Sequence, residues 1–205
     1  MLLSHIAGMF THPHQEWDNI QKEHSSPAKL SIYICLLALI GPICAYVSTT
    51  QYGWQVGDGQ LVFLSQSSAL TLSVLTYISM VVGVFVLGIM IDWMSKNYGS
   101  GHDEMAANGI ALMAYSCTPL FLVGLVSLYP SPWLNVMAYL AAAGYAAYLM
   151  YDGLPRVLKI HEDQAFFFIG AIMTIALVYM VTTLIATVII WGVGFAPEFT
   201  SLPAN

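Results

Sequence analysis

Residues 165–191 read AFFFIGAIMTIALVYMVTTLIATVIIW, an apolar run without a charged side chain. About 20 such residues in an α-helix are enough to cross the hydrocarbon core of a bilayer. Lipid offers backbone N–H and C=O groups no hydrogen-bond partner, so a spanning segment must satisfy these groups within its own helix. This stretch therefore predicts a transmembrane α-helix.

The composition of the whole chain agrees with a membrane protein. Of its 205 residues, 58% are hydrophobic and 8% are charged, whereas a soluble domain carries about 25% charged residues. So few charges cannot cover a water-facing surface, and we expect the lipid bilayer to surround most of the chain. The formal net charge of −6, from 11 acids and 5 bases, argues against nucleic acid as a partner.

Further apolar runs predict an all-α fold, a polytopic transmembrane bundle of five spans. The spans are expected over residues 27–48, 68–91, 106–128, a fourth run ending near 151, and 165–191. Kinks are expected at Gly41-Pro42 and at Pro119, because proline cannot continue the helical hydrogen bonding. The fourth span is expected to end near residue 151, because the helix-ending sequence Gly153-Leu154-Pro155 follows Asp152.

The chain divides into three parts on this reading. Residues 1–26 form a cytoplasmic amphipathic segment of short helices, the second opening at Thr11 or His12 with Pro13 in its first turn. Residues 27–194 form the five-helix transmembrane domain, and residues 195–205 form a short external tail.

The basic residues predict the orientation of the bundle. Lys22 and Lys29 precede the first span, Lys96 lies between the second and third, and Arg156 and Lys159 lie between the fourth and fifth. Because basic loops stay in the cytoplasm, these three segments and the amino terminus are expected to be cytoplasmic, and the carboxyl terminus external.

The same three segments hold all six histidines, together with several carboxylates. Imidazole nitrogen beside carboxylate oxygen is a donor set that zinc, nickel or copper accepts. The predicted ligands of such a divalent metal ion are His12, His14, Asp18, His102, Asp103, His161 and Glu162. No H-x-x-x-H or H-E-x-x-H pattern is present, so a site requires the three segments to converge. The alternative is that these histidines simply lie in solvated loops.

The sequence contains no motif typical of an enzyme active site. There is no G-x-S-x-G, no glycine-rich phosphate loop and no buried pair of carboxylates. Asp92 and Asp152 fall at the ends of spans, where they are expected to be interfacial or helix-end carboxylates and not proton relays.

Several short motifs together resemble the Yip-domain family of membrane proteins, in particular its bacterial inner-membrane branch. They are Gly8-Met9-Phe10-Thr11-His12-Pro13, Ile43-Cys44-Ala45-Tyr46, Gly57-Asp58-Gly59, Thr118-Pro119-Leu120-Phe121-Leu122 and Tyr148-Leu149-Met150-Tyr151. The resemblance implies a five-span protein of the inner membrane with a cytoplasmic amino terminus. Eukaryotic members associate with Rab-type GTPases partly through a longer amino-terminal region, and this chain has only about 26 residues there, so GTPase binding is not carried over.

These observations favour a non-enzymatic membrane organiser or adaptor. Its cytoplasmic face and the small residues at 141–147 are expected to meet either another membrane protein or a second copy of the chain. The alternative is a small transporter or channel for a divalent metal cation, with the bent first and third helices lining its path.

Overall fold

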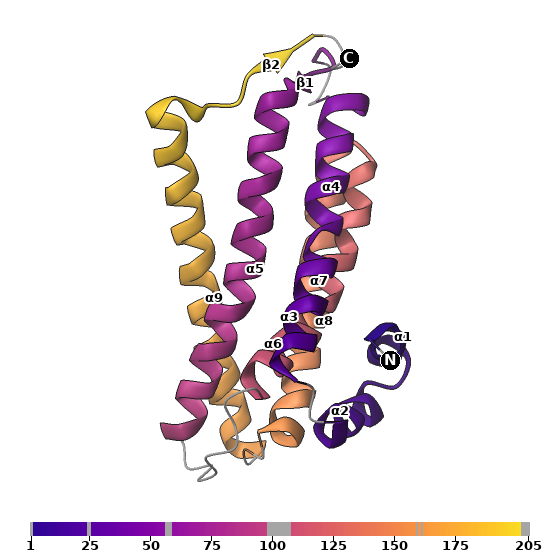
Figure 1. Cartoon of the computed structure of the whole chain (residues 1–205), viewed down its shortest axis with the longest axis vertical. Helices are drawn as coiled ribbons and strands as arrows, with labels where there is room; N and C mark the ends of the chain where they lie inside the picture. The colour runs from indigo at the N-terminus through magenta and orange to yellow at the C-terminus, as the bar shows by residue number, and fades with distance from the viewer. Residues whose placement is uncertain are drawn as a thin grey trace.

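The computed structural model describes residues 2–23, 26–55, 59–97, 108–158, 160 and 162–201. The helices are α1 (Leu2–Thr11), α2 (Pro13–Glu23), α3 (Pro27–Ala38), α4 (Ile40–Val47), α5 (Gln66–Asn97), α6 (Asn108–Ser116), α7 (Thr118–Leu122), α8 (Pro132–Val157) and α9 (Glu162–Ile190). Two π-helical segments, η1 (Ser48–Tyr52) and η3 (Trp191–Phe195), extend α4 and α9, and the 3-10 helix η2 (Val123–Leu128) extends α7. The predicted all-α fold is confirmed. The long helices run side by side along the long axis, with α1 and α2 at the lower end (Figure 1).

Three helical segments within the described ranges are long and apolar enough to cross a membrane. They cover residues 27–52, 66–96 and 164–195, and the pair 108–116 and 118–128, bent by 40°, makes a fourth if it is one span. In the segment at 164–195, large apolar side chains such as Leu177, Leu184 and Ile185 are more than half exposed. Apolar faces of this extent suit hydrocarbon and not water.

The two predicted kinks lie where proline removes a helical hydrogen bond. Pro42 has no N–H to donate to the carbonyl of Ala38, and α3 ends at Ala38. Pro119 likewise has no N–H to donate to the carbonyl of Tyr115, and α6 ends at Ser116. Proline placement in the sequence therefore fixes both breaks.

Glycines allow the closest approaches between helices. A Cβ atom added to Gly124 in η2 would lie 2.4 Å from the Cα of Gly41 in α4. A Cβ added to Gly109 in α6 would lie 2.5 Å from the carbonyl oxygen of Gly88 in α5. At the second crossing the Asp92 carboxylate accepts a hydrogen bond from the backbone N–H of Gly109 at 2.7 Å. Asp92, a buried side chain of α5, thus satisfies a free donor in the first turn of α6.

The end of α8 differs from the prediction. The helix does not stop near residue 151 but continues to Val157, with Pro155 inside it. The Arg156 guanidinium donates a hydrogen bond to the carbonyl oxygen of Asp152 at 2.8 Å and also contacts the Asp152 carboxylate. These contacts hold the last turn in place, which is why the local helix-ending signal is overridden.

A small sheet closes the opposite end of the bundle. Strand β1 (Phe63–Leu64) pairs antiparallel with β2 (Phe199–Thr200), with Phe63 opposite Thr200 and Leu64 opposite Phe199. The backbone N–H of Ser65 donates to the carbonyl oxygen of Glu198 at 2.9 Å. The tail after α9 is therefore tied to the segment that leads into α5, at the top of Figure 1.

Candidate functional site: the docked N-terminal helix pair

Helices α1 and α2, here called the N-terminal helix pair, supply part of the main hydrophobic core. Met9 and Trp17 are fully buried and Ile20 is 4% exposed. These side chains join a cluster that includes Leu112 of α6 and Leu154 of α8. The helix pair is therefore packed into the bundle and does not merely rest on the membrane surface.

A hydrogen bond between side chains joins the two members of the helix pair. The imidazole of His5 in α1 contacts the carboxylate of Glu16 in α2, and both side chains are largely buried. The Glu16 side chain lies directly over Gly8, since a Cβ at Gly8 would overlap it. The ring of His5 also meets Tyr115 of α6 edge to face, with 5.6 Å between ring centroids. The pair is thus held in one arrangement and oriented toward the bundle.

The Trp17 indole fills a notch at Gly153 of α8. A Cβ added to Gly153 would lie 2.7 Å from Cε2 of Trp17 and 2.6 Å from Cδ1 of Leu112. The same indole meets the ring of Tyr115 edge to face, with centroids 6.5 Å apart and an interplanar angle of 85°. Only glycine leaves room for the indole at position 153, so this residue determines where α2 docks.

A charged cluster holds α2 to α8 beside this notch. Nδ1 of His14 lies 2.5 Å from Oδ1 of Asp152, which is 6% exposed and also contacts Arg156. Nε of Arg156 lies 3.8 Å from Oδ1 of Asp18, whose side chain is 55% exposed. Asp152 is the buried centre of the cluster, so its loss removes the partner of His14 and one partner of Arg156, whereas Asp18 contributes little because solvent screens it.

The carboxyl-terminal end of α1 docks higher on the same face of α8. The Tyr145 hydroxyl donates a hydrogen bond to the carbonyl oxygen of Met9 at 2.8 Å. The ring of Phe10 stacks on that of Tyr145, with centroids 5.4 Å apart. The bond satisfies one of the carbonyl groups that a helix end leaves without an internal partner.

The contacts of α8 with the helix pair follow one stripe of that helix. Tyr145, Asp152, Gly153 and Arg156 lie at the i, i+7, i+8 and i+11 spacing of a single helical face. This spacing is visible in the sequence, but it does not reveal that the partner is the amino terminus. Sequence reasoning missed His5, Trp17 and Tyr145 for this reason.

Of the predicted metal ligands, the described side chains are those of His12, His14 and Asp18; the side chains of His102, Asp103, His161 and Glu162 lie outside the described part. His12 is exposed. His14 contacts Asp152 of α8, and Asp18 contacts Arg156 of the same helix. Within the described side chains, no group of three or more histidine, cysteine or acidic residues is placed to hold a metal ion.

Comparison with known proteins identifies the class to which the chain belongs. The Yip1 domain family matches residues 7–195, and the chain belongs to that family. It is similar to the inner membrane protein YohC of Escherichia coli strain K12, with 38% identity over 194 residues that cover 94% of this chain and 98% of YohC. YohC of Escherichia coli O6:H1, strain CFT073, is similar to the same extent, with 38% identity over 194 residues. No solved structure matches the chain. The chain is thus a multi-pass inner-membrane protein of the Yip1 family.

Proposed function

We propose that this protein is a non-enzymatic organiser or adaptor of the inner membrane, whose N-terminal helix pair presents a fixed surface to other proteins. The observation that carries the proposal is the docking of α1 and α2 on α8 through Trp17, Asp152 and Tyr145. Short amphipathic helices that only bind lipid need no such contacts with a bundle. A rigid polar surface at the membrane lets a partner bind without ordering a flexible segment.

The surface offered to a partner is the outer face of α2. Gln15, Asp18 and Asn19 are exposed there, as is His12 just before the helix, while Trp17 is buried on the opposite side. Polar side chains at these positions supply hydrogen-bond donors and acceptors around a face that carries little net charge. A partner with a mixed polar surface, or a second copy of the chain, suits this chemistry.

The proposal includes a five-span topology with the helix pair in the cytoplasm. Helix α8 has 26 residues, which at 1.5 Å per residue is about 39 Å and longer than the hydrocarbon core of about 30 Å. The last turns of α5 and α8 carry Lys96 and Arg156, and these two helices end at the end of the bundle that holds α1 and α2 (Figure 1). The positive-inside rule then makes residues 1–26 cytoplasmic, 27–194 the membrane domain and 195–205 an external tail.

Photocrosslinking in native membranes tests the adaptor role. A photoreactive amino acid placed at the exposed positions Gln15 or Asn19 is expected to give a covalent adduct with one defined protein or a second copy. Asp152→Ala weakens the docking of α2 and is expected to lower the adduct yield about fivefold or more, since removing one partner of a buried ion pair costs about 3–5 kcal/mol. Glu198→Ala, which removes an exposed carboxylate beside the β1–β2 sheet at the opposite end of the bundle, is the control and should leave the yield unchanged.

The adaptor role fails if neither position gives a protein adduct, or if the same adducts form from Leu184. That side chain is 59% exposed on α9 and faces lipid in the proposed topology. A probe at Leu184 therefore reports random encounters within the membrane.

The rival function, transport of a divalent metal cation, has its own measurement. It requires His12, His14, Asp18, His102, Asp103, His161 and Glu162 to include a set of metal ligands. Zinc, nickel or copper bound stoichiometrically to protein purified without an affinity tag, and lost when His12 and His14 are both changed to alanine, would favour the rival. Because His14 is paired with Asp152 at 2.5 Å, we expect substoichiometric metal that does not respond to this double substitution.

A further inference from the structure

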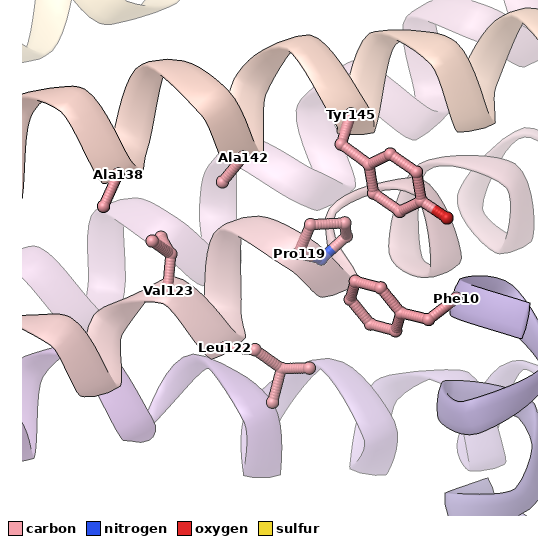
Figure 2. Close-up of a pocket in the computed structure, with 7 residues that line it drawn as sticks. All are labelled: Phe10, Pro119, Leu122, Val123, Ala138, Ala142 and Tyr145. Atoms are coloured by element: carbon pink, nitrogen blue, oxygen red, sulfur yellow. The ribbon is translucent and has the colours of Figure 1, made fainter.

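An open apolar groove runs between α8 and the broken helix formed by α7 and η2. It has a volume of about 510 Å³. Its walls are Pro119, Leu122, Val123, Ala138 and Ala142. Figure 2 shows Ala138 and Ala142 on α8 facing the side of Val123 and Leu122, with Phe10 and Tyr145 at one end. The groove exists because two alanines, one helical turn apart, leave α8 without bulk on this side.

The helix pair closes one end of the groove. The Phe10 ring of α1 stacks on Tyr145 of α8 there, with centroids 5.4 Å apart. The one polar group at this end, the Tyr145 hydroxyl, is already bonded to the carbonyl oxygen of Met9 at 2.8 Å. The groove therefore offers an occupant apolar contact and almost no hydrogen bonding.

In the proposed five-span topology, in which α8 crosses the membrane, the position of the groove along α8 puts it in the hydrocarbon region, and the Phe10 end of α1 reaches into the same region. Ala142 lies nine residues after Trp133 and fourteen before Arg156, which is about 14 Å and about 21 Å along the helix. Trp133 is 79% exposed, as an aromatic side chain at the membrane interface would be. The medium beside the groove is thus lipid chains and not water.

We propose that the groove binds one acyl chain of a membrane phospholipid and holds it longer than the surrounding lipid. An apolar trough open along its side and closed at one end matches a flexible hydrocarbon chain, which can enter laterally. A second copy of the chain fits poorly, because a stable interface uses about 20–30 residues on each side, far more than line this groove. A straight helix crossing the membrane would also meet α1 at the closed end. This inference rests on the proposed topology, in which α8 crosses the membrane, and not on the adaptor role.

Photolabelling in nanodiscs tests the proposal directly. The full-length protein is reconstituted with phosphatidylethanolamine that carries a diazirine midway along one acyl chain, and labelled residues are mapped by mass spectrometry. We expect labels to concentrate on Leu122, Val123 and Ala138. Ala138→Phe fills the groove from a half-buried position and is expected to lower this labelling about tenfold, because bound methylene groups lose their contacts. Ala141→Phe, on an exposed face of the same helix, should leave it unchanged.

The proposal is overturned if wild-type labelling of the groove is no denser than labelling of Leu184 and Ile185 on the exposed face of α9. It is equally overturned if Ala138→Phe and Ala142→Phe both leave the groove labels unchanged. The comparison of groove labels with α9 labels in the wild-type protein tests the proposal even if a variant fails to fold. Disulfide-linked dimers formed through Ala138→Cys would show instead that a second copy occupies the groove.

Discussion

Gly124→Ala is expected to lower the free energy of unfolding by about 3 kcal/mol, or about 10 °C in Tm for a chain of this size. The added methyl group would lie 2.4 Å from the Cα and 2.8 Å from the backbone nitrogen of Gly41. Backbone atoms cannot turn aside as a side chain can, so η2 and α4 must move apart. The measurement is the loss of monodisperse protein in mild detergent after heating, followed by fluorescence-detected size exclusion.

Two other glycines provide matched controls for Gly124. A methyl group at Gly41 meets nothing closer than 3.8 Å, and one at Gly144 meets no heavy atom within 4 Å. Gly41→Ala should therefore be tolerated, and Gly144→Ala should be neutral or slightly stabilising, because alanine favours the helix by about 1 kcal/mol. Equal losses in all three variants would show that glycine content, and not the crossing of α4 with η2, controls stability.

Trp17→Ala is expected to have a comparable or larger effect and to detach the N-terminal helix pair. Removing a fully buried indole costs about 3–5 kcal/mol, and Trp17 is 0% exposed between Gly153 and Tyr115. Backbone amides of α1 and α2 should then exchange with deuterium much faster, while those of α5 keep their protection. Hydrogen exchange with mass spectrometry in nanodiscs measures both regions in one experiment.

The control for Trp17 is the exposed tryptophan at the opposite end of α8. Trp133 is 79% exposed, so Trp133→Ala should leave exchange in α1 and α2 as in the wild type. If Trp17→Ala also leaves these helices protected, the docking notch at Gly153 does not hold the helix pair in place.

Local signals in the sequence predicted much of the helical fold. The start of α3 is an example, because the Ser26 side chain accepts from the backbone N–H of Lys29 at 3.4 Å with Pro27 in the first turn. The start of α2 at Pro13 and the breaks near Pro42 and Pro119 follow the same kind of rule. Each depends on a residue and its neighbours within one helical turn, so the sequence contains the whole signal.

The contacts that build the candidate site depend on partners far along the chain, and the sequence did not reveal them. Trp17 reads as one apolar position of a short amphipathic helix, and its notch at Gly153 is supplied by α8. The wrong end predicted for α8 has a local cause instead, because Asp152 and Arg156 are an i,i+4 pair that stabilises a turn that Pro155 would otherwise weaken. The pairing of β1 with β2 likewise joins two short segments that have no strand pattern of their own.

The sparse protein contacts of α9 make its tilt a property of the surrounding bilayer. Its apolar segment at residues 164–195 has 32 residues, and 6% of the most apolar 18-residue stretch within it is buried. At 1.5 Å per residue it is about 48 Å long, against a hydrocarbon thickness of about 30 Å. The helix must therefore tilt to keep its apolar side chains within the hydrocarbon core. One fixed point is the bond from the Tyr179 hydroxyl to the carbonyl oxygen of Ser79 at 2.7 Å. A thicker membrane would reduce the tilt of α9, with the Tyr179–Ser79 contact as the fixed point. Hydrophobic mismatch therefore acts on this helix more than on the rest of the bundle.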